Sequence, residues 1–473
     1  MTEIAKFLEN AAELLGPQGL TDDAETLAPW LTDWRGRFTG AACAMASPRT
    51  VDELSALVRL CAEYKMPIVP QGGNSGMVGG ATPDTSGDAL LLSLRRMNAI
   101  RAFDVESRKI TCEAGVILQN LHETVAEENL RFPLTLGGKG SATVGGLVST
   151  NAGGSQVLRH GSMRSLVLGL EAVMADGTVF SMLTPLKKDN RGFDLKQVLI
   201  GSEGTLGIVT AATLMLLPAL SDRVVIWAGL SSLRAARALL LHCEDAVGDA
   251  LEGFEVIPDH CLEAVLDHLP NARAPLQGSH PWHALIEVVA DQNGAQSLRE
   301  SCESMLANAF ERDRLDDAVI AANETQAEAF WLLRESIAAA ERGRGPAVQH
   351  DISVPVEKMP EFVEAAVPKI ESDWPRTSAV AFGHLGDGNV HFHVIAPHGV
   401  DAETWLETDA KTISRHVHDM VTDWGGSISA EHGIGQLKRE ELARLGDPAS
   451  LTLMRRIKHA LDPEGLLNPG KLI

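Results

Sequence analysis

Two short segments near the C-terminus hold residues that could bind a metal ion. The first, residues 382–393, is predicted to be strand, tight turn and strand, because Asp387-Gly388 is a preferred pair for a two-residue hairpin turn. That turn places His384 opposite His391, with Cβ atoms about 4.5–5.5 Å apart, close enough for two imidazoles to share a metal ion. The segment therefore predicts two histidine ligands on one face of a hairpin.

The second segment contains the neighbouring pair Glu431-His432. Adjacent side chains of an extended chain point to opposite sides, so one of the pair would ligate; with Glu431 as the ligand, His432 is placed as a general base. Two histidines and a glutamate with an open position are typical of a catalytic zinc site, where the metal polarises a substrate oxygen. Spacing alone leaves open the alternative of solvated hairpin histidines and an unrelated Glu-His pair.

Three glycine-rich segments lie in the N-terminal half of the chain. The first, residues 70–80, follows a short predicted strand, and its glycines would let the backbone aim N–H groups at a diphosphate. It has neither the Gly-x-Gly-x-x-Gly pattern nor the lysine of a P-loop. The second, residues 136–154, consists largely of small residues that leave space for a large flat ligand, and the third is residues 201–210. Each alone could be a surface loop, whereas three in one domain are far more specific.

These three segments resemble the FAD-binding domain of the vanillyl-alcohol-oxidase superfamily. Residues 383–393, 430–435 and 467–472 resemble the FAD-linked D-2-hydroxyacid dehydrogenases, especially the D-2-hydroxyglutarate and D-lactate dehydrogenases, and the resemblance covers essentially the whole chain. It implies an α+β fold with a two-subdomain FAD-binding domain, an α+β substrate or cap domain with an antiparallel sheet, and a C-terminal helical segment that returns to the FAD domain. The expected boundaries are 1–220, 221–400 and 401–473.

Patterning in the second of these domains predicts strands alternating with helices, and a sheet that helices cover on one face. The predicted strands are 224–230, 253–257, 284–289 and 318–321, and the predicted helices are 233–247, 295–310 and 326–342.

The resemblance also implies roles for individual residues. FAD would be non-covalent, because Asn74 occupies the position at which some relatives attach flavin through His or Cys. Arg334 would bind the substrate carboxylate, and the metal would be zinc, with manganese or cobalt as alternatives. The residues implied to contact FAD are Pro70, Gly72, Gly73, Asn74, Ser75, Gly76, Leu136, Gly137, Ser141, Thr143, Gly146, Ser149, Thr150, Gly153, Gly154, Gly204, Gly207, Ile208, Val209 and Asn468.

The activity implied is oxidation of a small anionic D-2-hydroxy acid to the 2-oxo acid, with hydride transfer to flavin N5. Electrons would pass to a separate acceptor such as an electron-transfer flavoprotein or a quinone, and a homodimer is expected. The alternatives are an oxidase that uses O2, a D-lactate or glycolate oxidase or dehydrogenase subunit of a larger redox complex, and a zinc hydrolase, which leaves the glycine-rich segments unexplained. Ala338, Gln349 and His393 depart from the 2-hydroxyglutarate pattern of Thr, Lys and Asn, which places that substrate in question.

Composition sets wider limits. A chain of 473 residues suggests two or three domains, and the formal net charge of −22 argues against nucleic-acid binding. We expect no signal peptide and no membrane span. The six cysteines lack Cys-x-x-Cys spacing and read as reduced, mostly buried thiols, which together predict a cytoplasmic protein.

Overall fold

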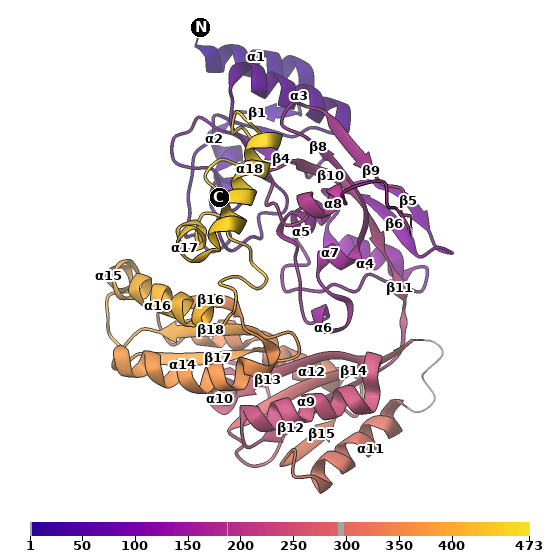
Figure 1. The fold of residues 1–473 in the computed structure, drawn as a ribbon, viewed down its shortest axis with the longest axis vertical. Coiled ribbons are helices and arrows are strands. Elements are labelled where there is room, and N and C mark those ends of the chain that lie inside the picture. The colour runs from indigo at the N-terminus through magenta and orange to yellow at the C-terminus, as the bar shows by residue number, and fades with distance from the viewer. Residues whose placement is uncertain (1, 187, 292–297) are drawn as a thin grey trace. The chain divides into compact units, whose positions relative to one another are not determined.

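A computed structural model describes residues 2–186, 188–291 and 298–473. The chain divides into two compact units (Figure 1). Unit 1 contains Met1–Gly154, His160–Pro218 and Glu431–Ile473, and unit 2 contains Ser155–Arg159 and Ala219–Ala430. The chain thus enters unit 2 close to the boundary expected at 220 and returns to unit 1 at Glu431, later than the expected 401.

The first half of unit 1 is built on a four-stranded sheet with the order β1-β2-β4-β3. β4 pairs in parallel with both β2 and β3, and β1 is antiparallel to β2. Helix α1 packs on this sheet through Phe7, Ala11 and Leu15, and α3 begins where the Thr50 hydroxyl accepts a hydrogen bond from the Glu53 N–H. The elements are α1 (Glu3–Leu15), β1 (Leu20–Thr21), α2 (Ala24–Leu27), β2 (Ala44–Ala46), α3 (Val51–Tyr64), β3 (Ile68–Gln71) and β4 (Leu90–Ser93).

The second half of unit 1 is a five-stranded antiparallel sheet with the order β5-β6-β10-β8-β9. Its core includes residues of α4, α5, α7 and α8. The elements are β5 (Ile100–Asp104), β6 (Lys109–Glu113), α4 (Leu118–Ala126), α5 (Val144–Thr150), α7 (Met163–Leu166), β8 (Val167–Val173), β9 (Val179–Met182), α8 (Leu195–Leu199) and β10 (Ile208–Met215).

Shorter elements complete unit 1 and its junction with unit 2. β7 and β11 pair as a two-stranded ribbon, and two helices near the C-terminus belong to unit 1. These elements are β7 (Leu130–Arg131), α6 (Val157–His160), β11 (Leu217–Pro218), α17 (Arg439–Leu445) and α18 (Pro448–Leu461).

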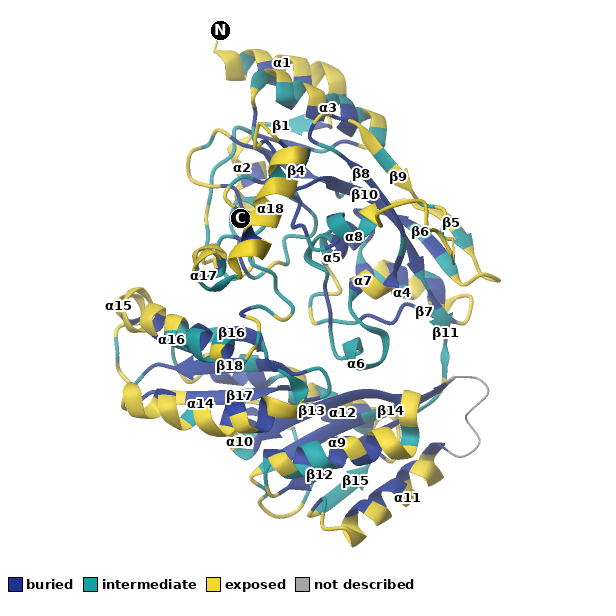
Figure 2. Ribbon diagram, viewed as in Figure 1, coloured by how far each residue is buried: buried dark blue, intermediate teal, exposed yellow. Residues whose placement is uncertain are grey.

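Unit 2 is organised on a seven-stranded sheet with the order β15-β12-β14-β13-β17-β18-β16, in which every neighbouring pair is antiparallel. The central strand β13 is buried along its whole length (Figure 2). The strands are β12 (Leu220–Leu230), β13 (Leu251–Pro258), β14 (Trp282–Asp291), β15 (Asp317–Ile320), β16 (Ala347–Ser353), β17 (Ser378–His384) and β18 (Asn389–Ile395).

Helices cover both faces of this sheet, so the prediction of one covered face is wrong. Alternate residues of β12 explain why: Ile226 belongs to a core shared with α9, α11, α14 and α16, whereas Trp227 belongs to a core shared with α10, α12 and α13. A strand with apolar residues at successive positions is buried on both sides. The helices are α9 (Leu233–Val247), α10 (Asp259–His268), α11 (Leu298–Glu311), α12 (Glu324–Glu335), α13 (Ile337–Arg342), α14 (Met359–Asp373), α15 (Ala402–Glu407) and α16 (Asp409–Asp423).

The four predicted strands of unit 2 correspond to β12–β15, and the helix predicted at 233–247 matches α9. The helix predicted at 295–310 corresponds to α11 from Leu298 onward, and its first three positions lie outside the described residues. All six cysteines are free thiols. No helix in the described ranges combines the length and the apolar character needed to cross a membrane.

Candidate functional site

The hairpin that carries the candidate metal ligands has a different register from the predicted one. His384 is paired with Asn389, and Phe382 with His391, so residues 385–388 form a four-residue loop. Leu385 is fully buried and its N–H donates to the Phe254 carbonyl of β13, which removes it from the strand pairing. A two-residue primed turn needs positive φ at both central positions, and of Asp387 and Gly388 only Gly388 has it.

The register differs by two residues, so the side chains keep the predicted face. His384 and His391 now meet diagonally, with ring centroids 5.5 Å apart. In the described part of the chain, His384, His391 and Glu431 form the one group of three potential ligands near enough for a metal ion, with one ligand atom from each within 4.8 Å of the others. Glu431 directly follows Ala430, whose N–H donates to the Asp351 carbonyl of β16. Metal binding by this group remains a prediction.

Sequence analysis missed a residue that contacts this cluster, Glu255. It lies on β13 directly opposite His384 and is 1% exposed. One carboxylate oxygen accepts a hydrogen bond from Nε of Arg334 at 2.8 Å, and the other lies 2.5 Å from Nδ1 of His384. The Arg334 guanidinium also stacks over Phe382, with Cζ 5.1 Å from the ring centroid. An acidic residue inside an apolar predicted strand was the available signal, because a buried charge requires partners.

The charges in this cluster shift the pKa values of its members. Burial alone would raise the pKa of Glu255, but the positive charges of Arg334 and His384 outweigh it and hold that pKa far below its ordinary value. Burial, together with the charges of Arg334 and His384, lowers the pKa of His391 well below its ordinary value. His391 is therefore held as neutral imidazole, the form that ligates a metal.

Two positions that depart from the 2-hydroxyglutarate pattern lie beside the cluster. His393 is on the same face of β18 as His391, opposite Gln349 of β16, and its Nδ1 pairs with the carboxylate of Glu341. Glu341 is 2% exposed. Because the partner of His393 is an acidic residue, this pair does not supply the positive charge that a lysine would bring.

The hairpin turn is fixed by Asn389. Its side-chain amide donates to the Asp351 carboxylate and to the Ile352 carbonyl, each at 2.9 Å, and its N–H donates to the Asp387 carboxylate. Asn389 therefore connects the start of β18 to β16. His350, also on β16, has Nδ1 2.9 Å from the Phe392 carbonyl oxygen.

Within unit 1 the three glycine-rich segments converge. A Cβ atom at Gly72 would overlap the Thr143 hydroxyl, and one at Gly73 would overlap the Ser141 carbonyl. The first segment therefore packs closely against the second, and at Gly73 the two backbones meet. The Glu203 N–H donates to the Ser149 carbonyl, which joins the second segment to the third. The predicted FAD residues thus come from one connected group of loops: residues 70–76 at the end of β3, 136–154 around α5, and 204–209 at the start of β10.

Asn74 and Asn468 both have backbone in the left-handed region, at φ 52° and 44°. The Asn74 amide donates to the Thr32 carbonyl at 2.8 Å. The Asn468 amide donates to the Gly80 and Glu203 carbonyls, and among the described residues no donor reaches its buried Oδ1. Among the described helices none begins at Asn468, so its side chain caps no helix.

Glu203 also organises the segment that follows His432. Its two carboxylate oxygens accept hydrogen bonds from the N–H groups of Ile434 and Gly435, both at 2.7 Å. Burial raises the pKa of Glu203 in spite of these two donors and of Lys438. Sequence analysis named this residue only as part of a glycine-rich segment.

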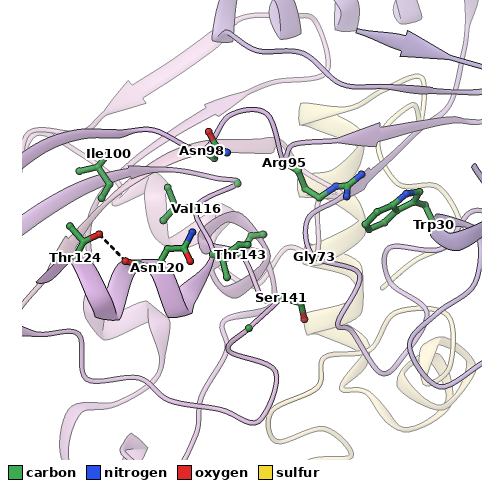
Figure 3. Close-up of a pocket in the computed structure, with 13 residues that line it drawn as sticks. Trp30, Gly73, Arg95, Asn98, Ile100, Val116, Asn120, Thr124, Ser141 and Thr143 are labelled. Atoms are coloured by element: carbon green, nitrogen blue, oxygen red, sulfur yellow. Dashed lines mark hydrogen bonds between the residues drawn. The ribbon is translucent and has the colours of Figure 1, made fainter. Parts of the chain in front are cut away.

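A cavity of about 480 Å³ lies against the same loops in unit 1 (Figure 3). It is lined by three of the predicted FAD residues, Gly73, Ser141 and Thr143. The Arg95 guanidinium lies over the Trp30 ring, 3.4 Å from its centroid, and both residues line the cavity. This stacked pair, which was not predicted, adds a cation and an aromatic surface to the glycine-rich loops.

Comparison with known proteins agrees with this arrangement. Residues 220–472 match the family "FAD linked oxidases, C-terminal domain", and residues 42–182 match "FAD binding domain". The chain is 37% identical to the mitochondrial D-2-hydroxyglutarate dehydrogenase of Arabidopsis thaliana over 461 residues, covering 98% of this chain and 80% of that protein. It is 36% identical to that of Bos taurus over 463 residues, covering 98% and 82%.

The fold is also similar to that of a solved structure, p-cresol methylhydroxylase with substrate bound. That chain is 17% identical, with a TM-score of 0.77 over 99% of this chain and 96% of that one. The likeness shows the vanillyl-alcohol-oxidase type of fold.

The relatives correct one expectation, the cytoplasmic location. The plant and cattle enzymes are named as mitochondrial, which points to a mitochondrial rather than a cytoplasmic location. Reduced cysteines are typical of reducing compartments in general and do not single out the cytoplasm among them. That inference from cysteine usage was therefore too narrow.

The expected α+β fold and the FAD-binding domain are confirmed by the family matches and by the fold likeness. The chain belongs to the FAD-linked oxidases and is an FAD-linked oxidoreductase.

Proposed function

We propose that this protein oxidises a D-2-hydroxy acid of the 2-hydroxyglutarate type to the 2-oxo acid, with the aid of a divalent metal. The observation that carries the proposal is the cluster of Arg334, His384 and His391 around Glu255, in a chain with an FAD-binding domain. Relatives that match nearly the whole chain are named D-2-hydroxyglutarate dehydrogenases.

Arg334 binds the substrate carboxylate in this proposal. Glu255 accepts the hydrogen bond of the Arg334 Nε–H. Among the described residues, the two terminal nitrogens of the planar guanidinium then remain to bind a carboxylate through two parallel hydrogen bonds. His432 accepts the proton of the substrate hydroxyl as general base. Bound FAD would supply the hydride acceptor and a bound metal would supply positive charge beside the substrate oxygens.

The residues present fit a metal such as zinc. Neutral imidazole and carboxylate are ligands that zinc accepts, and three protein ligands leave a position for substrate. The low pKa of His391 favours its ligating form. We propose His384, His391 and Glu431 as the ligands.

The residues present also fit FAD. The buried Oδ1 of Asn468 lacks a donor among the described residues, and a cofactor N–H could supply one. We propose that the cavity beside Gly73, Ser141 and Thr143 receives one end of the extended dinucleotide, against the stacked Arg95. A non-covalent cofactor, a separate electron acceptor and a homodimer remain predictions.

The test is anaerobic reduction of the flavin, followed as loss of its visible absorbance, with D- and L-2-hydroxyglutarate and D- and L-lactate. Each acid is tried before and after removal of metal with a chelator. We expect rapid reduction by a D-acid, loss of reduction after chelation, and recovery when zinc or manganese is added back.

Comparison of D-2-hydroxyglutarate with D-lactate addresses the departures at Gln349 and His393. Preference for D-lactate over D-2-hydroxyglutarate would mean that the absence of a lysine at position 349 changes which hydroxy acid the protein prefers. Reduction that is insensitive to chelation would contradict the metal role, and a purified, FAD-reconstituted protein without a flavin band would contradict the whole proposal.

A further inference from the structure

We infer that Glu255 is a positioning residue that sets both the tautomer of His384 and the direction of the Arg334 guanidinium. The inference rests on the proposed function, because it assigns Glu255 to the site formed by those two residues. It adds a component that the candidate ligands and the candidate base do not include.

The geometry leaves Glu255 little freedom. Its side chain is 1% exposed on the central strand β13, and its two oxygens have different partners, Nε of Arg334 and Nδ1 of His384. α12 supplies the arginine and β17 supplies the histidine, so one carboxylate joins three elements of unit 2. A displacement of Glu255 would therefore move both partners.

The contact with His384 has a chemical consequence. A carboxylate is only an acceptor, so the Nδ1 atom facing it carries the proton. The charged ring of His384 also carries a proton on Nε2. When a metal displaces that proton, the lone pair is on Nε2, the nitrogen that can ligate the metal. A carboxylate bonded to the second nitrogen of a ligating histidine fixes its tautomer and orientation and increases its basicity.

The contact with Arg334 has a second consequence. The guanidinium is held from one side by Glu255 and lies over Phe382, so its terminal nitrogens have a fixed direction. A fixed fork loses less side-chain entropy when it binds a carboxylate. Glu255 thus prepares the metal ligand and the substrate-binding cation together.

The substitution Glu255→Gln separates this role from simple packing. A glutamine of similar shape has one acceptor oxygen and one donor nitrogen, so it cannot accept from both partners. Where the amide N–H faces Nδ1, His384 must carry its proton on Nε2, which blocks metal binding there. We expect the dissociation constant for zinc to increase roughly 10- to 100-fold.

Zinc affinity is measured in the full-length FAD-loaded protein by competition with a chromophoric chelator. The control is Glu287→Gln, on the adjacent strand β14, because Glu287 also pairs with an arginine, Arg223, at 2.8 Å. We expect Glu287→Gln to leave zinc affinity unchanged. Equal affinity of wild type and Glu255→Gln for zinc would overturn the inference while leaving the metal site intact.

A wild-type protein that binds no zinc, manganese or cobalt would instead overturn the metal assignment and this inference with it. If Glu255→Gln does not fold, the imidazole ¹⁵N spectrum of metal-free wild type provides the test, with the His384 signals assigned by their loss in His384→Gln. Protonation of Nδ1 is expected, and a neutral ring protonated on Nε2 would overturn the inference.

In steady-state kinetics, Glu255→Gln at saturating zinc should raise KM for the hydroxy acid more than it lowers kcat. The reason is that Arg334 is still present but no longer held in direction. An unchanged KM would overturn the Arg334 half of the inference.

Discussion

Arg334 has two constraints that a lysine could not satisfy together with a substrate carboxylate: the hydrogen bond to Glu255 and the stacking over Phe382. In Arg334→Lys a single ammonium group would have to choose between Glu255 and substrate. A lost charge-assisted hydrogen bond is worth about 1.5–3 kcal/mol, so we expect kcat/KM for the preferred hydroxy acid to fall roughly 10- to 150-fold. Steady-state assays with an artificial electron acceptor measure this.

The matched control is Arg223→Lys, because Arg223 also bonds a strand carboxylate, Glu287, but has no neighbour among the candidate ligands. It should lose stability without a comparable loss of kcat/KM. Equal kinetic losses in the two variants would contradict a substrate-binding role for Arg334.

A second residue-scale prediction concerns pH. Burial lowers the pKa of Lys471 from 10.5 to about 8, against the opposing effect of Asp84. Between these values the unfolded state binds more protons than the folded state, so the Lys471 contribution to the free energy of unfolding becomes more favourable as pH rises. We expect wild type to gain stability relative to Lys471→Met as pH rises from about 8 towards 10.5.

Urea unfolding at several pH values checks this difference. Lys6→Met, which removes an exposed lysine, is the control for loss of a lysine charge as such. If the difference in free energy of unfolding between wild type and Lys471→Met does not change with pH, the lowered pKa of the buried Lys471 is contradicted.

Sequence patterning could find the candidate ligands because spacing along the chain carries that information. His384 and His391 share a hairpin, and Glu431-His432 are adjacent. Glu255 could not be assigned in this way, because its partners lie 79 and 129 residues away. The pattern of the strand indicates that Glu255 is buried, but only the three-dimensional structure shows that its partners are Arg334 and His384.

At the scale of elements, the loop between β17 and β18 depends on Gly388. Its φ is 80°, and a Cβ atom there would overlap the Val354 carbonyl oxygen. Gly399 has the same φ, with no atom within 4 Å of its Cβ position. Gly388→Ala should therefore cost at least about 1 kcal/mol more free energy of unfolding than Gly399→Ala, since both share the backbone strain and only one adds a collision.

Urea unfolding of the two variants gives the comparison, and zinc affinity gives a second readout. Gly388→Ala should weaken zinc binding, because the loop joins the strands of His384 and His391, whereas Gly399→Ala should not. Equal stabilities would show that the hairpin tolerates rearrangement of this loop.

The same loop shows why element boundaries were easier to predict than register. Asp387-Gly388 correctly indicated a turn, but the burial of Leu385 against β13 extended it to four residues. Likewise strands β12–β15 were recognised from their patterns, and the helix predicted at 326–342 overlaps α12 and α13. That these helices cover a second face of the sheet was not predicted. A continuous apolar strand such as β12 does not reveal from its own sequence how many layers cover it.

At the scale of the molecule, metal and stability should be linked. A ligand that binds the folded chain alone stabilises it by about 2.7 kcal/mol at 100 times its dissociation constant. Zinc added to metal-free protein should raise the unfolding temperature of wild type and not of His391→Gln. The control His350→Gln removes a buried histidine with a structural role, and zinc should still raise its unfolding temperature. If zinc no longer raised the unfolding temperature of His350→Gln, a specific site at His391 would be contradicted.

The tail of the chain pairs with a strand near its beginning. Ile68 of β3 forms a parallel bridge with Leu467, and its carbonyl accepts from the Asn468 N–H at 2.8 Å. Unit 1 therefore includes residues that the ribosome makes only after the whole of unit 2. During synthesis the edge strand β3 lacks this partner until unit 2 has been made. Chaperones that shield exposed strand edges would therefore matter more for unit 1 than for the sheet of unit 2.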